Sequence, residues 1–500
     1  MKRAVVVGSG AGGLASAVML AQAGWAVTVL EQHTRAGGFL HRFFRKGIGY
    51  DTGFHYIGSA GPQQLVWRIF GHLGIREKLR LMPLDPEGFD WIRFPGLDFR
   101  VPVGVDNYGE RLRQQFPHEA AGIARYIQLH KETCAAYGWY NLDLSVPVDR
   151  VLRAEGISLR EVLDDCFRDV RLRAVVAGQA VLYGVPPKDA PLGLHAVVTD
   201  HFLQGAYTVR GGGDRIAMEL VRRLRSLGGV LKLRARVEHI EVQGGAAVAV
   251  HAGGVRYDAD LIVANAHPKH VLELLPEGAT RPAYRDRVVD ATAGRGHLGL
   301  YMRVKGDLSQ LARRNLYRFS SFDEAVLDQP ATPSSIPFWF LTAPGARDPG
   351  RPGSEQVVLG LIQTDWKDLR SKVPEIGTPG EPAAYQSPAY LAWKREMVAA
   401  CVKATTADFP GWEVLEAEGS SPLTTWRYTG SPEGATYGHY HSVAQMGRYR
   451  LPIKVRVKNL LQVGHAVGFP GICGAMMSAY AALGDVLGAE QLVSELKEVQ

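Results

Sequence analysis

Six residues near the start of the chain, Gly8-Ser9-Gly10-Ala11-Gly12-Gly13, have the spacing of a dinucleotide-binding turn. Gly8 permits a tight turn, Gly10 lets a pyrophosphate approach the bare backbone, and Gly13 lets the next helix pack closely. Glu31 follows 23 residues after Gly8 (31 − 8 = 23), where its carboxylate can accept hydrogen bonds from ribose hydroxyls. Because an acidic residue disfavours a 2′-phosphate, the pattern predicts FAD or NAD rather than NADP.

Four side chains in two short segments are candidates for proton transfer. His55 and Tyr56 follow the first glycine-rich loops, and His439 and His441 precede the last apolar strand. Hydride movement at a C–C bond depends mainly on positioning, and an acid or base is needed only where a proton is also added or removed. For each of the four, the alternative is a structural side chain bonded to the backbone.

Other catalytic classes lack their motifs. His439 and His441 have no carboxylate at metal-ligand spacing and no HExxH pattern, so we expect no metal. The chain has no GxSxG motif, which removes the simplest hydrolase interpretation. Widely spaced cysteines without a CxxC pair predict no disulfide framework and favour a reducing, cytoplasmic setting. They are Cys134, Cys166, Cys401 and Cys473.

The elements that must position these residues alternate along the chain. Strand, helix and strand patterns surround the first glycine turn, and residues 63–205 are mostly helical in pattern. An amphipathic helix is predicted over 216–227, with turns at Gly244-Gly245 and Gly253-Gly254 after it. Short strands are predicted over 230–233, 237–242, 247–250, 261–264 and 460–464, and a closing helix over 475–487.

This order predicts a Rossmann-type α/β cofactor domain assembled from separated segments, 1–62, 205–270 and 455–497. Residues 63–204 and 271–454 then form a mixed α+β substrate domain with a helical part. A nicotinamide enzyme usually completes its nucleotide fold in one continuous stretch. The layout therefore favours a flavoprotein.

The composition is that of an ordinary globular protein of two or three domains, with 500 residues, 46% hydrophobic and 21% charged. The net charge of +7 includes the cluster Arg222–Arg225, which falls in a helical pattern and predicts a solvated face. No nucleic-acid motif accompanies it, so we expect no nucleic-acid partner. Met1-Lys2-Arg3 and the apolar stretch behind it imitate a secretory signal, but glycines at turn positions disfavour one. The run 466–484, which has no charge or histidine, holds four glycines and a proline, which is unlike a membrane span.

Two N-terminal segments, Glu31–Gly38 and Asp51–Gly58, resemble the FAD-binding start of the phytoene desaturase superfamily, most closely its retinol saturase and carotenoid isomerase groups. Further similar segments are 205–212, 264–268, 437–439 and 464–474. The resemblance implies a glutathione-reductase-like fold with FAD as cofactor. It also implies an oxidoreductase that saturates, desaturates or isomerises C=C bonds of a long apolar polyene or isoprenoid through flavin N5.

The resemblance, with the glycine pattern, assigns cofactor contacts. A helix N-terminus at 470–473 would give amide donors to the flavin N1–O2 edge, and Val237 would hold the adenine through its backbone. His465 stands where the family commonly has an acidic residue, and Arg210 where it often has proline. Whether position 465 makes the hydrogen bond to the flavin phosphate or ribityl chain that an acidic residue would make therefore stays open. The predicted cofactor contacts are Gly8, Gly10, Ala11, Gly12, Gly13, Glu31, Gln32, Gly37, Gly38, Val237, Gly464, His465, Pro470, Gly471, Ile472 and Cys473. Cys473 is expected to be a packing residue rather than a covalent flavin anchor.

Two other functions stay open: a flavin amine oxidase, and a non-catalytic flavin-binding component of a lipid or pigment assembly. The predicted partners are an apolar small molecule and an external electron donor or acceptor. The segment Leu65–Phe70 combines apolar and basic side chains and predicts a peripheral membrane contact. Aromatic residues either line an apolar channel or fill the core, and the second is favoured. They are Trp67, Phe70, Trp91, Phe338, Trp339 and Phe340.

Overall fold

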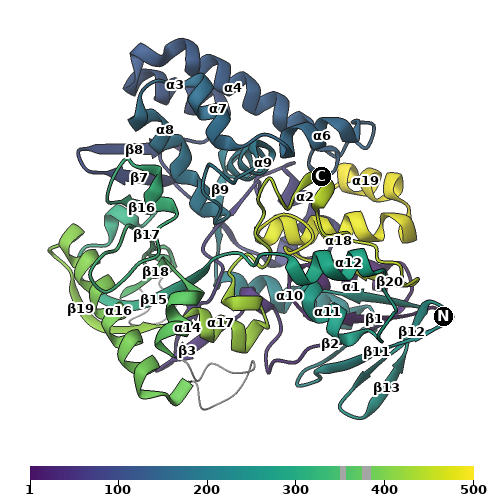
Figure 1. The fold of residues 1–500 in the computed structure, drawn as a ribbon. Coiled ribbons are helices and arrows are strands. Elements are labelled where there is room, and N and C mark those ends of the chain that lie inside the picture. Colours follow the sequence, from purple (N-terminus) through teal and green to yellow (C-terminus); the bar gives the residue numbers. More distant parts are fainter. Residues whose placement is uncertain (349–355, 374–384, 500) are drawn as a thin grey trace.

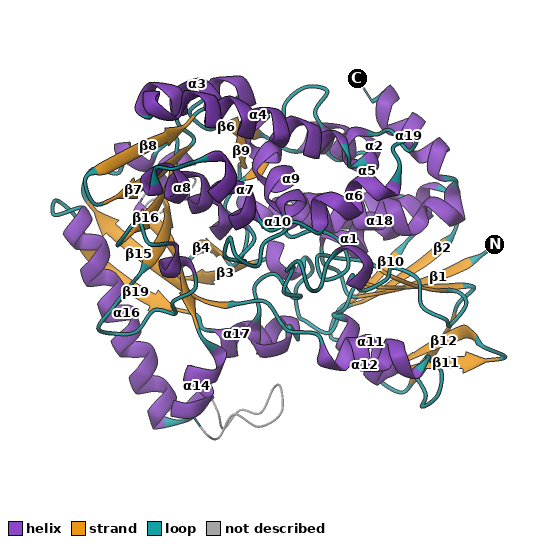
Figure 2. Cartoon of the chain, turned by 45° about the horizontal axis from the view of Figure 1, so that its top comes forward, coloured by secondary structure: helices purple, strands orange, loops and turns teal. Residues whose placement is uncertain are grey.

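The protein is built around two sheets, with helices packed against and between them (Figure 1). A computed structural model describes residues 1–348, 356–373 and 385–499. In the second view the parallel sheet lies on the side of the N-terminus and the larger sheet on the opposite side, with a group of helices above both (Figure 2).

A five-stranded parallel sheet holds the first and last predicted strands side by side, in the order β10-β2-β1-β14-β20. Its strands are β1 (Arg3–Val7), β2 (Ala26–Leu30), β10 (Val230–Lys232), β14 (Leu261–Ala264) and β20 (Leu460–Gln462). The prediction of a Rossmann-type fold assembled from separated segments is confirmed, while the residue boundaries of the two domains stay a prediction.

The central strand β1 is apolar on both faces because both faces are covered. Ala4 and Val6 pack in the core shared with three helices, α1 (Ala11–Gln22), α10 (Gly212–Ser226) and α18 (Gly471–Leu487). Val5 and Val7 point the other way, as the twofold period of a strand requires, and pack against an antiparallel meander. The meander consists of β11 (Val237–Gln243), β12 (Ala246–Ala252) and β13 (Val255–Asp258).

A seven-stranded sheet forms the second layer, in the order β19-β15-β18-β17-β16-β7-β8. Its pairs are antiparallel except β16–β7, which is parallel and sets Asn315 beside Asp90. Two of its strands come from the stretch predicted to be mostly helical. The strands are β7 (Asp90–Phe94), β8 (Leu97–Val101), β15 (Gly296–Lys305), β16 (Asn315–Phe319), β17 (Phe338–Thr342), β18 (Val357–Thr364) and β19 (Glu413–Gly419).

After β8 that stretch is helical, as predicted, and it forms a cap over one end of the seven-stranded sheet (Figure 1). Its helices are α3 (Val105–Gln115), α4 (Ala120–Ala135), α5 (Gly138–Asn141), α6 (Val148–Glu155), α7 (Leu159–Cys166), α8 (Val170–Ala177) and α9 (Leu192–Leu203). Ser158 and Glu161 start α7 with a reciprocal capping box, which satisfies two amides at the helix end.

Short elements connect these layers. The strands are β3 (Arg42–Arg45), β4 (Ile48–Asp51), β5 (Ile57–Gly58), β6 (Leu81–Pro83) and β9 (Ala206–Val209). The helices are α2 (Leu65–His72), α11 (Pro268–Leu274), α12 (Pro282–Asp290), α13 (Pro344–Arg347), α14 (Trp366–Lys372), α16 (Pro388–Asp408), α17 (Pro422–Thr429) and α19 (Ala489–Glu498).

The prediction that Leu65–Phe70 contacts a membrane surface is wrong. Leu65, Val66, Ile69 and Phe70 form the buried face of α2 and belong to the core beneath the parallel sheet, so their side chains cannot rest on a lipid surface. Among the described helices, none has the length and apolar character needed to cross a bilayer.

Candidate active site

The turn after β1 has the backbone geometry that the glycine pattern predicts. Gly8 has a φ of +90°, in the left-handed region, and its amide donates to Leu30 O over 2.8 Å. A Cβ on Gly13 would lie 2.2 Å from Gly8 O, so only glycine lets α1 start this close to the turn. The first-turn amides of Ala11 and Gly12 have no partner inside the helix and face the turn, where a phosphate could accept hydrogen bonds from them.

Glu31 at the end of β2 is buried and ties this turn to the neighbouring strand. Its Oε2 accepts from Ser9 N (2.8 Å) and Ser9 Oγ (2.6 Å), and its Oε1 accepts from His33 N (2.8 Å). Oε1 can accept a further bond, so Glu31 can also serve a ribose hydroxyl. Gln32 is exposed beside it. Both remain predicted cofactor contacts.

The second glycine pair lies directly on the first turn. Gly37 N donates to Ser9 O over 3.0 Å, and a Cβ on Gly38 would lie 3.3 Å from Gly10 Cα. Both glycines have positive φ angles, +113° and +55°. The two glycine segments, far apart in sequence, therefore form one surface of bare backbone, as a pyrophosphate and ribityl chain require.

Asn265, directly after β14, is a site residue that our sequence reasoning missed. A Cβ on Gly10 would lie 2.6 Å from Asn265 Nδ2, and one on Gly12 or Gly464 would lie 2.9 Å from its Oδ1. Asn265 thus fills the space that the missing side chains leave. In the sequence, residues 264–268 are distinguished only by their resemblance to the phytoene desaturase superfamily. A polar residue following a buried strand at the centre of the sheet was the available signal.

The closing helix starts four residues earlier than predicted. Pro470 is its N-cap, and Gly471, Ile472 and Cys473 form its first turn instead of a preceding loop. Their amides are therefore the free donors of a 17-residue helix. The thiol of Cys473 is half-buried, and burial raises its pKa to about 12. It stays protonated, as expected of a packing residue.

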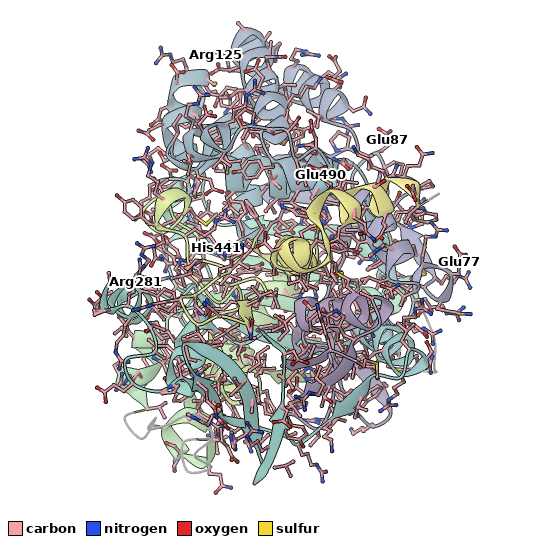
Figure 3. The ribbon with its side chains drawn as sticks, turned by 90° about the vertical axis from the view of Figure 1, so that its right-hand side faces the viewer. Glu77, Glu87, Arg125, Arg281, His441 and Glu490 are labelled. Carbon is pink, nitrogen blue, oxygen red and sulfur yellow. The ribbon has the colours of Figure 1, made fainter. Side chains whose placement is uncertain are left out.

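Histidines gather where the segment before β20 approaches the loops after β14 and β20. His441 Nε2 lies 2.9 Å from His465 O, and the rings of His439 and His441 are 5.6 Å apart. Burial lowers the pKa of His439 and of His465 to about 4, and that of His441 well below its usual range. Figure 3 shows His441 in the interior, whereas Arg125 lies at the rim. These imidazoles are neutral, so His465 offers no charge to a phosphate.

The other predicted pair lies in the loop before β5. The two ring nitrogens of His55 are buried without a partner among the described residues, and burial lowers its pKa to about 4. The Tyr56 hydroxyl donates to Asp90 Oδ2 over 2.8 Å. No hydrogen bond or ring contact joins this pair to His439 or His441 within the part of the chain that the structure describes.

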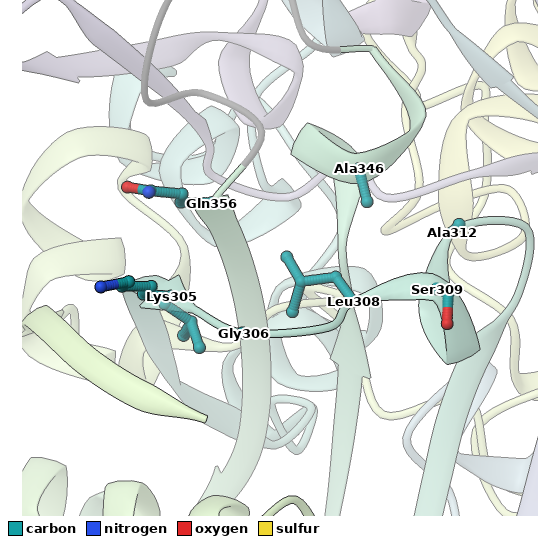
Figure 4. Close-up of a pocket in the computed structure, with 8 residues that line it drawn as sticks. Lys305, Gly306, Leu308, Ser309, Ala312, Ala346 and Gln356 are labelled. Carbon is teal, nitrogen blue, oxygen red and sulfur yellow. The ribbon is translucent and has the colours of Figure 1, made fainter. Parts of the chain in front are cut away.

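His55 lines a cavity of about 280 Å³ between the β3–β4 hairpin, the start of α10 and α13. The ion pair Arg42–Asp51 (2.7 Å) and Phe54 form part of the same wall. A second cavity, of about 420 Å³, lies where β15 ends and α13 passes, and it contains none of the predicted site residues (Figure 4).

The remaining candidates lie in ordinary structural positions. Val237 begins β11 with a buried side chain, and its backbone role toward an adenine stays a prediction. Trp67 is half-buried with Arg76 over its ring, and the other aromatic candidates are core residues, as favoured. These are Phe70, Trp91, Phe338, Trp339 and Phe340.

Within the described residues, one group has the donor types of a metal site: His130, Cys134 and Asp200. His130 Nε2 lies 3.7 Å from Asp200 Oδ1, and Asp200 Oδ2 already accepts from Tyr140 and Gln204. None of the predicted site residues belongs to it. We interpret the group as a polar contact between α4 and α9.

The glycine surface fits a flavin dinucleotide. Without side chains, Gly10 and Gly12 pack against Asn265 and Gly38 packs against Gly10, and the free amides of α1 and α18 border this bare backbone. Comparison with known families decides the assignment, because residues 11–487 match the family described as flavin containing amine oxidoreductase. The chain belongs to this family. The prediction of an FAD-dependent oxidoreductase is confirmed.

Curated relatives of this flavoprotein align over nearly its whole length. All-trans-retinol 13,14-reductase from Rattus norvegicus is 29% identical over 99% of this chain and 87% of its own. All-trans-zeta-carotene desaturase from Myxococcus xanthus is 24% identical over 75% of this chain and 76% of its own. The predicted membership of the phytoene desaturase and retinol saturase superfamily is confirmed.

Solved structures share the fold of this flavoprotein at low sequence identity. An oxidoreductase from Methanosarcina mazei superposes with a TM-score of 0.66, at 16% identity, over 96% of this chain and 99% of its own. Putrescine oxidase with bound putrescine superposes with a TM-score of 0.62, at 15% identity, over 97% and 99%. These likenesses confirm the fold class.

Proposed function

We propose that this protein acts on carbon–carbon double bonds of a long apolar polyene or isoprenoid, by reduction or cis–trans isomerisation. The observation that carries the proposal is that the alignment with the retinol 13,14-reductase from Rattus norvegicus covers 99% of this chain. The half-buried ring of Phe202, 4.4 Å from the Tyr56 ring, supports it, because it offers flat apolar surface to a planar chain.

FAD, when bound, supplies hydride exchange at flavin N5. The chain's own residues have three tasks in this proposal. The glycines and Asn265 shape the bed for the dinucleotide, and the amides at the starts of α1 and α18 stabilise negative charge. The neutral histidines His439, His441 and His465 close one side without adding charge beside an apolar substrate.

The test is anaerobic incubation of the dithionite-reduced, FAD-loaded protein with a panel of polyenes, followed by chromatography and mass spectrometry. A product heavier by two hydrogens indicates saturation, and an unchanged mass at a new retention time indicates isomerisation. A product lighter by two hydrogens from the oxidised protein indicates desaturation. Failure of every polyene to change, or to reoxidise the flavin, overturns the proposal.

The amine oxidase alternative is supported by the family description and by the putrescine oxidase fold. Oxygen-dependent peroxide release on addition of amines, without reaction of polyenes, would favour it over the polyene proposal.

We also propose a cytoplasmic protein that takes its substrate from a membrane by peripheral contact, through a face other than Leu65–Phe70. Co-sedimentation with anionic liposomes at low salt is the expected result. Protein that remains in the supernatant contradicts the peripheral contact.

A further inference from the structure

A carboxyl group is buried beneath Tyr56, at the start of β7. Asp90 is 0% exposed, and its Oδ1 accepts from Asn315 Nδ2 over 2.9 Å. Its Oδ2 accepts from the Tyr56 hydroxyl over 2.8 Å. The parallel register of β7 and β16 sets Asn315 directly beside Asp90, so this contact follows from the sheet itself.

Tyr317, two residues further along β16, extends the cluster. Its hydroxyl lies 2.7 Å from the Tyr56 hydroxyl, where either can donate. Asp90, Tyr56 and Tyr317 therefore form one chain of hydrogen bonds. A proton can pass along such a chain by small shifts within each bond, without movement of the side chains.

The titratable groups that face Asp90 are Tyr56, Tyr317 and Arg347. Arg347 Nη2 donates to Asn315 Oδ1 over 3.0 Å, and its Nη1 is buried without a partner among the described residues. The bonds from Asn315 and Tyr56 and the charge of Arg347 lower the Asp90 pKa, but burial outweighs them and raises it to about 7. Near neutral pH this carboxyl can hold or release a proton.

The cluster lies one aromatic layer behind the His55 cavity. Phe340 stacks parallel to the Tyr56 ring at 6.4 Å and contacts the His55 ring at 5.2 Å. His55 in turn lines the cavity. Tyr317 also contacts Phe340, at 5.0 Å, but Tyr56 is the member of the cluster that directly follows the cavity-lining residue His55 in the chain.

We propose that Tyr56 is the catalytic acid that protonates substrate carbon during C=C reduction, and that Asp90 is the positioning residue that stores its proton. This inference rests on the proposed function and deepens it, because reduction consumes a proton whereas isomerisation consumes none. It therefore assigns saturation as the reaction.

The step balances in atoms and electrons. One carbon of the double bond receives a hydride, with two electrons, from the reduced flavin. The π bond breaks, and the other carbon receives the Tyr56 hydroxyl proton. Asp90 returns a proton to the Tyr56 oxygen, and its carboxylate later regains one from water. A two-electron donor outside the protein restores the reduced flavin.

The test compares wild type, D90N, Y56F and D90E, with D98N as the matched control. Asp98 accepts from Trp91 Nε1 on the same hairpin, but its side chain is 54% exposed and lies outside the cluster. Each protein is loaded with FAD, reduced with dithionite and mixed anaerobically with all-trans-retinol between pH 5 and 9. FAD content and circular dichroism establish which variants are folded.

We expect D90N and Y56F to reduce retinol about 100-fold more slowly, the lower limit for loss of a general acid. Cis–trans isomerisation should be unchanged in both, D90E should recover part of the rate, and D98N should behave as wild type. The fall in wild-type rate above about pH 7 should be absent from D90N. Infrared difference spectra of the oxidised protein should show a protonated carboxyl band that disappears in D90N and persists in D98N.

Wild-type rates of reduction in folded D90N and Y56F would overturn the inference. Absence of the carboxyl band from the wild type would overturn the role of Asp90, whatever the substrate. Failure of the wild type to react with any polyene would instead overturn the proposed function. The infrared measurement does not depend on turnover, so the two failures are distinguishable.

Discussion

Burial sets the charge of the titratable side chains around the proposed active site. His55 and His439 have pKa values lowered to about 4, and the Asp90 pKa is raised to about 7. In each case desolvation is the largest cause, and it favours the neutral form. The histidines are therefore neutral at neutral pH, and the Arg42–Asp51 ion pair places two opposite charges in the wall of the His55 cavity.

The Asp90 pKa predicts a pH dependence of stability. The folded protein holds a proton up to about pH 7, whereas the unfolded chain releases it near pH 4, so the unfolding free energy falls as pH rises between these values. The fall contributed by Asp90 is about 4 kcal/mol over that range. We expect thermal melts of D90N to lack this contribution between pH 4 and 7. A D90N profile that parallels those of wild type and D98N would contradict the prediction.

Glu31 predicts a second residue-scale effect. In E31Q a neutral amide replaces the carboxylate that accepts from Ser9 N and Oγ, and one of these buried donors loses a charge-assisted bond. We expect FAD affinity to fall about 5- to 150-fold, from a cost of about 1–3 kcal/mol. Flavin fluorescence titration of the apoprotein measures it. E490Q, on exposed α19, should bind FAD as the wild type does.

At the scale of elements, close contact between α1 and the β1 turn requires glycine. In G13A the new Cβ would meet Gly8 O at 2.2 Å, so the helix must move away from the turn. We expect G13A to lose bound FAD and to melt at a lower temperature. G411A is the matched control, because a Cβ there has no atom within 4 Å and the residue is exposed. Equal FAD content in the two purified variants would show that close packing is unnecessary.

Much of the cofactor bed could be predicted from sequence because its signals are local. The turn at Gly8–Gly13, the strand before it and the acid at Glu31 lie within one β-α-β unit, where spacing determines geometry. The strands β7 and β8 were hidden in a mainly helical stretch, since β7 joins the sheet by pairing with β16, over 200 residues away, and β8 pairs with β7 at the edge. Asn265 was missed because its role arises only when β14 lies beside β1.

The role of a single residue also depends on what it packs against in the fold. The apolar and basic pattern of Leu65–Phe70 predicted a membrane surface, but an amphipathic helix has the same pattern whether its apolar face meets lipid or core. Asp90 carried no signal at all, because a carboxylate at the start of an apolar strand is common. Its partners come from three separate segments, and only the fold brings them together.

At the scale of the whole molecule, a buried carboxylate is one of the polar contacts that join the helical cap to the segment before β20. Glu155, at the end of α6, accepts from Gly447 N over 2.6 Å and pairs with Arg450. Since Glu155 is 2% exposed, R450A would leave a buried charge without its cation. We expect a loss of about 3 kcal/mol in unfolding free energy.

Thermal or urea denaturation measures this loss, and R448A, an exposed neighbour, should leave stability unchanged. A wild-type midpoint for R450A would mean that the Glu155–Arg450 pair does not contribute to holding the cap in place.

The split parallel sheet has a consequence for biosynthesis. β1 and β2 leave the ribosome first. The strands β14 and β20, which extend the sheet beyond β1, begin only at residues 261 and 460 and are therefore synthesised much later. The nascent chain must therefore carry an unpaired strand edge through most of its translation, and such edges recruit other chains. The glycine turn cannot retain its flavin until α18 has docked. We expect coenzyme supply and chaperones to limit the yield of active protein more than the rate of its synthesis.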